Sequence, residues 1–463
     1  MKNLTLGINP SGGAPLYAQL YERIVGGISR GEIKAGEKLP SKRALAGNLG
    51  VSVNTVDTAY QMLTAEGYVQ AKPKSGFFVM RIERLESPAP GSAPKTVPAP
   101  AHPRIDFGTG SVDTSLFPYK TWGRIQREIL SGHPELLNLG EQNGDAELRE
   151  SIARYLHEYR GVACSAGQII VGAGMEYLLS QIAVMFSASI FALENPGYPK
   201  AASILKNHKI DPVFVPVDKD GLDVSGLADA DIVYVTPSHQ FPTGATMPIG
   251  RRQELLAWAC ERRGRYIIED DYDSEFRFDV RPVPSLQGLD GAGRVIYIGT
   301  FSRSLSPSIR IAYMALPEAL LPVYRRYFAG YSSTVSRFEQ HTLRRFIDGG
   351  HFSRHLNRTR VIYRARRDCL IKGLAASLGK ERIRISGEHT GLHLVLQVKA
   401  GLDETELAGR AAAAGVRLTG LSKYYRPGVE IPGCSLVLGY SALDESRIAE
   451  GCAALKSAWG LEG

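Results

Sequence analysis

Apolar residues follow a helical period in the first part of the chain. They recur every four positions, on one face of a predicted helix, at Leu16, Leu20, Ile24 and Ile28. The stretch "LPSKRALAGNLG" predicts a second helix, because Ser41 is a good N-cap and Gly50 a common helix terminator. After a tight turn, Ser52 is the predicted N-cap of a third helix, "VNTVDTAYQMLTAEGY".

A short basic hairpin is predicted directly after the third helix. The stretch "VQAKPKSGFFVM" has two β-prone runs around a tip that contains Lys and Gly. Helix, turn, helix and hairpin is the arrangement of a winged helix-turn-helix, whose second helix enters the major groove of DNA. Residues 1–84 carry eleven Lys and Arg against six Asp and Glu, which favours a double-stranded DNA partner. The alternative is a small helical domain with a solvated basic face.

Prolines separate this unit from the rest of the chain. The run "ESPAPGSAPKTVPAPAHPR" has no apolar period, so it predicts an extended, semi-rigid linker. At 463 residues the chain is also too long for one ordinary core. The predicted organisation is a small unit at 1–84, a linker at 85–104 and a large unit at 105–463.

Strand-like and helical stretches alternate in the large unit. Continuous Val- and Ile-rich runs occur in "QIIVGAG", "ASIFALENPGY", "DIVYVTPS", "RYIIEDDY" and "RVIYIGTFS". Such runs, separated by helices, predict an α/β fold whose parallel or mixed sheet is covered on both faces. Each run ends in polar residues or glycine, so one edge of the sheet is expected to gather chemical groups.

Some strand ends carry residues suited to an anionic or planar ligand. "VGAGMEYLL" predicts a helix start at Met175, and free backbone N–H groups at a helix start suit a phosphate. Tyr198 in "ENPGYP" is placed to stack on a planar ring, although a tyrosine in such a position more often packs in a core. His239 and Gln240 in "TPSHQFPTG" are expected on a loop at the surface.

Carboxylates end the strand "RYIIEDDY". Glu269, Asp270 and Asp271 are consecutive, and Tyr272 follows them. Carboxylates at a strand end often coordinate Mg²⁺, so a metal site is one interpretation. The other is an aspartate held against a pyridine nitrogen, which keeps that nitrogen protonated.

A serine-rich loop, "TFSRSLSPSIR", follows the strand "RVIYIG". Ser302, Ser304 and Arg310 in this loop are suitable donors to a phosphate. A lysine in such a loop could form a Schiff base with a carbonyl, because its amine can lose a proton. This loop has Arg303 instead, and a guanidinium cannot lose its proton in a protein.

Composition adds little to this picture. The chain is 44% hydrophobic and 22% charged, with a net charge of +8. No apolar run is long enough to cross a bilayer, so no membrane partner is expected. The first residues lack the apolar core of a signal peptide. Five cysteines show neither zinc spacing nor a disulfide framework, which favours a reducing cytoplasm.

The first unit resembles the DNA-binding domain of the GntR family over its full length. The matching stretches are "G.I.AGEKLPSKRALA", "LGVS.NTV..AY..L..EGY" and "SGFFV". The resemblance implies contacts to DNA from the turn, the second helix of the motif and the hairpin tip. The residues concerned are Lys42, Arg43, Ser52, Asn54, Thr55, Lys74, Ser75 and Gly76. One departure is Val53, where the family usually has arginine.

The large unit resembles the fold-type I aminotransferase domain that follows a GntR head in the MocR subfamily of bacterial regulators. Its marks are "TPSHQFPTG", "IIEDDYDSEFR", "YIGTFS", "HFSRHLNRTRVIYRARRD", "GLHL" and "LGYSAL". The resemblance implies an α/β fold-type I domain that binds pyridoxal 5′-phosphate (PLP), and a homodimer. The implied cofactor residues are Met175, Tyr198, Asp270, Tyr272, Ser302, Arg303 and Arg310, and Arg426 is the candidate for a ligand carboxylate.

The subfamily's lysine, which forms a Schiff base with PLP, is missing. The usual motif is S-K-x-L, whereas this chain has S-R-S-L with Arg303 at the lysine position. No lysine occurs between Lys219 and Lys372 to replace it. An internal aldimine and the lysine-assisted proton shift of aminotransferases are therefore unavailable at this loop.

Three functions follow as hypotheses. The favoured one is a transcription regulator that senses a small amino compound, with PLP or a PLP–amine adduct held noncovalently. The second is a working PLP-dependent aminotransferase with a vestigial head, which Arg303 argues against. The third is a regulator that binds some other ligand without PLP.

Overall fold

The computed structural model describes residues 14–81, 103–278, 283–426, 428–429 and 433–461. The chain divides into two units, Met1–Pro100 and Ala101–Gly463. The predicted linker, 85–104, lies outside the described residues apart from its last two positions.

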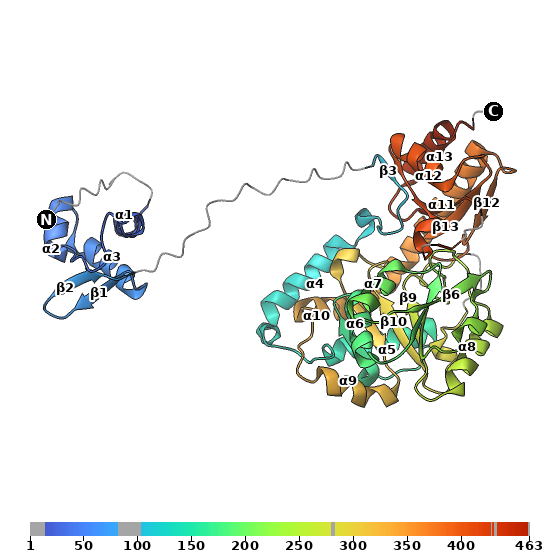
Figure 1. The fold of residues 1–463 in the computed structure, drawn as a ribbon, viewed down its shortest axis with the longest axis horizontal. Coiled ribbons are helices and arrows are strands. Elements are labelled where there is room, and N and C mark those ends of the chain that lie inside the picture. Colours follow the sequence, from blue (N-terminus) through green and yellow to red (C-terminus); the bar gives the residue numbers. More distant parts are fainter. Residues whose placement is uncertain (1–13, 82–102, 279–282, 427, 430–432, 462–463) are drawn as a thin grey trace. The chain divides into compact units, whose positions relative to one another are not determined.

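Three helices and a hairpin form the small unit (blue in Figure 1). They are α1 (Leu16–Arg30), α2 (Lys42–Leu49), α3 (Val53–Ala65), β1 (Val69–Lys72) and β2 (Gly76–Val79). The predicted caps are present, because the Ser41 hydroxyl accepts a hydrogen bond from Ala44 N and the Ser52 hydroxyl accepts one from Thr55 N. Tyr60 is fully buried and donates to the Pro40 carbonyl. This is the predicted helix-turn-helix with a hairpin after it.

An eight-stranded mixed sheet organises the large unit (Figure 1). Its strands, in spatial order, are β4 (Ile169–Gly172), β11 (Ala312–Ala315), β10 (Val295–Thr300), β9 (Tyr266–Asp271), β8 (Ile232–Val235), β5 (Phe191–Asn195), β6 (Val213–Asp218) and β7 (Gly221–Leu222). The middle of the sheet is parallel and consists of β10, β9, β8, β5 and β6. On one side of it, β11 pairs antiparallel with both β10 and β4.

Helices cover both faces of this sheet. They are α4 (Tyr119–Gly132), α5 (Ala146–Arg160), α6 (Met175–Met185), α7 (Pro199–Asn207), α8 (Ile249–Glu261), α9 (Leu321–Phe328), α10 (Arg337–Asp348) and the start of α11 (His351–Leu378). Because strand side chains alternate, Ile296 packs in the cluster of α6, α7 and α9, whereas Val295 packs in the cluster of α8. The prediction of a mixed sheet covered on both faces is confirmed.

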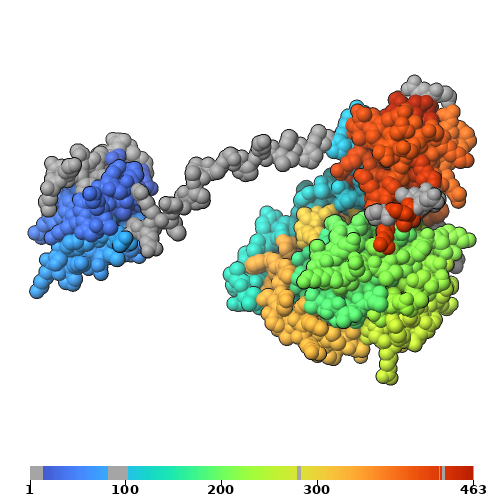
Figure 2. All heavy atoms as spheres, viewed as in Figure 1, coloured from blue at the N-terminus to red at the C-terminus, as the bar shows by residue number. Residues whose placement is uncertain are grey.

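A second sheet forms a C-terminal lobe, coloured orange and red in Figures 1 and 2, which sits against the lobe of the large sheet. It contains β12 (Ile383–Ser386), β13 (His393–Val398), β16 (Ser435–Gly439) and β15 (Thr419–Gly420). Helices α12 (Glu404–Ala413) and α13 (Glu445–Ala458) pack on it, and β3 (Ile105–Asp106) pairs in parallel with β14 (Val416–Arg417). No pattern in the sequence had predicted this sheet.

Helix α11 joins the two lobes of the large unit. It has 28 residues, which gives a length of roughly 40 Å. Phe352 near its start and Leu374 near its end belong to one continuous hydrophobic cluster, which also contains residues of both sheets. Among the described residues, no helix is both long and apolar enough to cross a membrane.

Leu374→Ala should lower the free energy of unfolding of the large unit by about 2–5 kcal/mol, because it leaves a cavity in a closed cluster. Val361 lies on the same helix and is 71% exposed, so Val361→Ala should change stability by less than about 0.5 kcal/mol. Denaturant unfolding followed by circular dichroism measures both effects. Equal effects from the two variants would contradict the assignment of α11 as the shared core helix.

Candidate functional site

A cavity of about 280 Å³ opens at the carboxyl ends of the parallel strands β5, β8, β9 and β10. The ends of these strands and the loops after them supply most of its lining, and the rest comes from the starts of α6 and α7 and the loop after β3. The lining residues are Thr109, Gly110, Met175, Glu176, Tyr198, Lys200, Thr236, Phe241, Asp270, Tyr272, Thr300, Ser302, Arg303, Pro307 and Arg310. The predicted gathering of chemical groups at one sheet edge is therefore present.

The structure brings together all of the residues predicted to contact the cofactor. Met175, Tyr198, Asp270, Tyr272, Ser302, Arg303 and Arg310 all line this one cavity. Arg426 does not line it. Its guanidinium lies over the ring of Phe214, 5.4 Å from the ring centroid, and its backbone N–H donates to Asn195.

Asp270 is a buried carboxylate that faces the cavity. Burial is the main cause that raises its pKa, from an ordinary value of 3.8 to about 7. The hydroxyl of Tyr234 donates a hydrogen bond to Asp270 Oδ2 and works in the opposite direction. The carboxyl group faces the cavity, where it can accept a hydrogen bond from a proton-bearing group of a ligand.

The two neighbouring carboxylates do not join Asp270. Glu269 accepts hydrogen bonds from the backbone of Leu286 and Gln287 at 2.8 Å each. Asp271 pairs with Arg160 at 2.7 Å and also accepts from a tyrosine hydroxyl. Side chains along a strand alternate between its faces, so Asp270 points to the opposite face from Glu269 and Asp271, and the three carboxylates cannot share one Mg²⁺ ion.

Arg303 brings an uncompensated positive charge to the cavity. No described carboxylate forms an ion pair with it, and its buried Nη1 has no hydrogen-bond partner among the described residues. The positive charge of Arg303 acts to lower the pKa of Tyr198, Tyr272 and His393, although burial outweighs it for both tyrosines. An anionic group of a ligand would satisfy this guanidinium.

Arg310 is held at the start of α6 by a strained backbone. Its φ of 55° is in the left-handed region, which non-glycine residues seldom adopt. Its Nη2 donates to Glu176 at 2.7 Å and to the Ala173 carbonyl at 3.3 Å. A Cβ atom at Gly174 would lie 2.2 Å from that nitrogen, which explains the glycine in "VGAGM".

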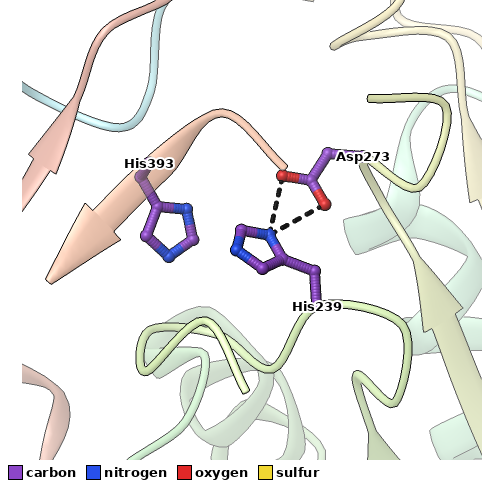
Figure 3. A group of neighbouring side chains, drawn as sticks. All are labelled: His239, Asp273 and His393. Atoms are coloured by element: carbon purple, nitrogen blue, oxygen red, sulfur yellow. Dashed lines mark hydrogen bonds and ion pairs between the residues drawn. The ribbon is translucent and has the colours of Figure 1, made fainter. Parts of the chain in front are cut away.

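A buried group of His239, Asp273 and His393 lies behind the cavity wall. Figure 3 shows the imidazole of His239 between the Asp273 carboxylate and the ring of His393. His239 Nδ1 is 3.0 and 3.1 Å from the two carboxylate oxygens. Tyr272 donates to the His239 carbonyl at 3.0 Å, so the group holds that tyrosine at the cavity.

The expectation that His239 and Gln240 lie at the surface is wrong. Both are 1% exposed. Gln240 donates to the Pro196 carbonyl and accepts from Thr243, so it ties the loop after β8 to the loop after β5. A polar residue in a loop can be buried in this way when its hydrogen bonds are satisfied.

His239, Asp273 and His393 also have the residue types of a metal site, and their potential ligand atoms lie within 4.8 Å of one another. However, His239 Nδ1 already bonds to Asp273, and His393 Nε2 donates to the Pro242 carbonyl. Burial, followed by the charges of His239 and Arg303, lowers the pKa of His393 well below its usual range. We therefore interpret the group as a hydrogen-bonded support of the cavity wall.

Comparisons with known proteins agree with this geometry. Residues 16–79 match the bacterial regulatory proteins of the gntR family, and residues 103–455 match aminotransferase class I and II. The uncharacterized HTH-type transcriptional regulator YdeL of Bacillus subtilis (strain 168) is 42% identical over 457 residues, which are 96% of this chain and 97% of that protein. The probable rhizopine catabolism regulatory protein MocR of Rhizobium meliloti is 34% identical over 96% of this chain and 94% of its own. The chain belongs to the MocR-like transcription regulators.

A solved structure supports the same assignment for the large unit. LysN, an α-aminoadipate aminotransferase from Thermus thermophilus, matches with a TM-score of 0.68 and 27% identity, over 77% of this chain and 92% of that one. The predicted fold class, a winged helix-turn-helix followed by an α/β fold-type I aminotransferase-like domain, is confirmed. This MocR-like chain is a DNA-binding transcription regulator.

The head of this MocR-like regulator presents its predicted DNA residues unequally. Arg43 and Asn54 are exposed, whereas Lys42 pairs with Asp57 and lies over the ring of Phe77. Ser52 and Thr55 form the cap of α3. Of the remaining three residues, Lys74 and Ser75 lie in the turn of the hairpin and Gly76 begins β2.

The residues of the site that were not predicted include two charged groups and one supporting tyrosine. Glu176 and Lys200 line the cavity, and Tyr234 supports Asp270. Glu176 directly follows the predicted helix start, and Lys200 lies two positions after Tyr198, so proximity to a predicted residue was the available signal. Tyr234 pairs with Ile268 in register, two positions before Asp270 on the same strand face.

Asp270→Asn should become more stable relative to the unchanged protein as the pH rises from about 4 to about 7. The folded pKa of Asp270 is raised, so the stability that its protonated form contributes is complete below the unfolded pKa and is lost as pH rises through the folded one. The free energy of unfolding of Asp270→Asn, minus that of the unchanged protein, should grow by up to about 1.4 kcal/mol per pH unit and then level off. Denaturant midpoints of the two proteins at pH 4 to 8 measure it.

Tyr234→Phe provides the matched control for this prediction. It removes the hydrogen bond that lowers the pKa of Asp270, so that pKa should rise further. The pH range over which the protein loses the stability of protonated Asp270 should then extend to higher pH. A difference between Asp270→Asn and the unchanged protein that does not depend on pH would contradict the raised pKa.

Proposed function

We propose that this regulator senses a small amino compound in the cavity of its aminotransferase-like domain, with PLP held there noncovalently. The observation that carries the proposal is that seven predicted cofactor residues line one cavity. One of them, Arg303, has a guanidinium at the position where the subfamily has its PLP-binding lysine. Binding of this ligand would change the affinity of the head for its operator.

The cavity residues fit the ring of PLP. Tyr198 offers an aromatic face at the cavity wall, and Asp270 offers a buried carboxylate to the ring nitrogen. Tyr272, held at the cavity by its hydrogen bond to the His239 carbonyl, would contact the ring's phenolic oxygen, and Ser302 and Arg310 would donate to the phosphate. When bound, PLP supplies an aldehyde that condenses with the amino group of a ligand.

Arg303 would orient the ligand instead of reacting with it. Its guanidinium stays protonated, so it cannot act as a nucleophile or as a base that moves a proton. Its planar set of donors suits a carboxylate or a phenolate. The proposed role is to bind the anionic group of the cofactor or of the effector, with little aminotransferase turnover.

Arg426 would contribute to a carboxylate subsite only after leaving Phe214, because it does not line the cavity. Lys200 is a better placed cation. Its Nζ lies at the cavity and is 2.9 Å from Glu176. We therefore propose that Lys200, when it is released from Glu176, helps to select acidic amino compounds.

A regulator that binds its ligand without PLP is the second candidate. The favouring observation is the carboxylate of Glu176, which already pairs with Arg310 in the part of the cavity where a phosphate would bind. We also propose a cytoplasmic homodimer, in which two heads would bind a repeated operator half-site.

Arg43→Ala should weaken binding of the chain to a cognate promoter fragment, because it removes an exposed cation from the proposed DNA surface. Val53 is 43% exposed at the first position of α3, so Val53→Arg should strengthen binding and steepen its salt dependence by about one unit of log–log slope. Arg30, which pairs with Glu32 at the end of α1, is the matched control. Fluorescence anisotropy at several salt concentrations measures all three, and equal effects of Arg43→Ala and Arg30→Ala would contradict the proposed surface.

Borohydride reduction in the presence of PLP should leave no pyridoxyl group within residues 299–313, because Arg303 has no reactive amine. Arg303→Lys should gain one there, together with a near-visible absorbance band that borohydride removes. Mass spectrometry of peptides locates the group.

Lys200→Arg is the control for this experiment, since Lys200 is the lysine that lines the cavity. The adduct of Arg303→Lys should persist in the double variant with Lys200→Arg. A folded Arg303→Lys protein that stays colourless and unmodified would contradict the PLP proposal and favour the second candidate.

A further inference from the structure

Glu176 is an anion at the start of α6. It is the second residue of that helix, its side chain is 32% exposed, and it lines the cavity. One of its carboxylate oxygens accepts from Lys200 Nζ at 2.9 Å, and the other accepts from Arg310 Nη2 at 2.7 Å. Both cations of this corner of the cavity are therefore engaged by one carboxylate.

The same corner has the features of an oxyanion subsite. The first backbone N–H groups of a helix have no partner within that helix, and they favour negative charge. Arg310 is directed to this point by its left-handed backbone and by the absence of a side chain at Gly174. Helix start, guanidinium and ammonium are arranged for an anion, and Glu176 supplies one from within the chain.

Glu176 is ionised under ordinary conditions. Burial acts to raise its pKa, but the hydrogen bonds from Arg310 and Lys200 outweigh burial and lower the pKa to about 2. A phosphate entering this corner would thus meet a negative charge and would have to take over two hydrogen-bonding cations from it.

We propose that Glu176 is an internal anion that occupies the oxyanion subsite of the cavity, so that a phosphate-bearing ligand binds there only by displacing it from Arg310 and Lys200. Glu176 is then a specificity determinant that weakens the contribution of a ligand phosphate. Arg303, which has no described carboxylate partner, remains the free site for an anionic group. This inference deepens the proposed function and rests on it for the identity of the cavity.

A pair of ligands that differ only in the phosphate tests this inference. Pyridoxine 5′-phosphate and pyridoxine share a ring and lack an aldehyde, so neither reacts with Lys200. Calorimetric titration of the full chain with both ligands, and with inorganic phosphate against chloride at matched ionic strength, measures the contribution of the phosphate. The proteins are the unchanged chain, Glu176→Gln, and Glu254→Gln as the control. Glu254 also pairs with an arginine, Arg251, but on α8 and outside the cavity lining.

Glu176→Gln should increase the affinity ratio of pyridoxine 5′-phosphate to pyridoxine by about tenfold or more, and should tighten inorganic phosphate to a similar degree. Glu254→Gln should change neither. An unchanged or decreased ratio, with unchanged or weaker phosphate binding, would overturn the proposal, because Glu176 would then organise the subsite instead of blocking it.

Failure of the PLP proposal gives a different result. If neither pyridoxine compound binds to any of the proteins, the cavity does not accept this ring, and the titrations with inorganic phosphate alone decide the role of Glu176. If circular dichroism shows that Glu176→Gln is unfolded, the unchanged protein still tests the inference. Its affinities for the two pyridoxine compounds should lie within about tenfold of each other, and a preference of about a thousandfold for the phosphate ester would overturn it.

Discussion

The carboxyl ends of four parallel strands meet at one edge of the large sheet, and the geometry of the cavity follows from that constraint. Parallel strands require crossover helices on the faces of the sheet, so the polar loops collect at the edge where ligands of such folds bind. Asp270 is fixed by its strand and by Tyr234 on the next one. The other cavity groups lie on the strand ends and loops at this edge, or on α6, α7 and the loop after β3.

The charges at this edge support the proposal that the cavity binds a ligand without the lysine chemistry of an aminotransferase. A lysine at position 303 would be able to lose its proton and react, whereas the guanidinium of Arg303 is a permanent charge. The neighbouring cations, Arg310 and Lys200, share one internal carboxylate, Glu176. Among the cavity cations that the structure describes, Arg303 is therefore the one without a carboxylate partner. Recognition of an anionic ligand should depend most on that residue.

Local signals in the sequence were sufficient to predict the head and most strands of the large sheet. The Ser41 and Ser52 caps and the Val- and Ile-rich runs are determined by nearby residues, so a pattern reveals them. The burial of His239 and Gln240 was not predictable, because it depends on Asp273, His393 and Pro196, which are brought together only by the fold. The second sheet was missed for a similar reason, since β13 pairs with β16, a strand almost 40 positions later.

The loss of a reactive lysine is compatible with a role in sensing. A ligand attached through a covalent bond to the protein leaves only as fast as that bond is broken, whereas a ligand held by hydrogen bonds and ion pairs exchanges freely. Occupancy of a reversible site follows the free ligand concentration, and a regulator can use it only if the ligand binds two states of the protein with different affinity. Because binding free energies are reciprocal, operator DNA must then change the affinity of the cavity by the same factor. If Arg303 supplies no catalytic chemistry, as proposed, the aminotransferase-like domain is a suitable reporter of concentration, since it would neither consume its ligand nor retain it.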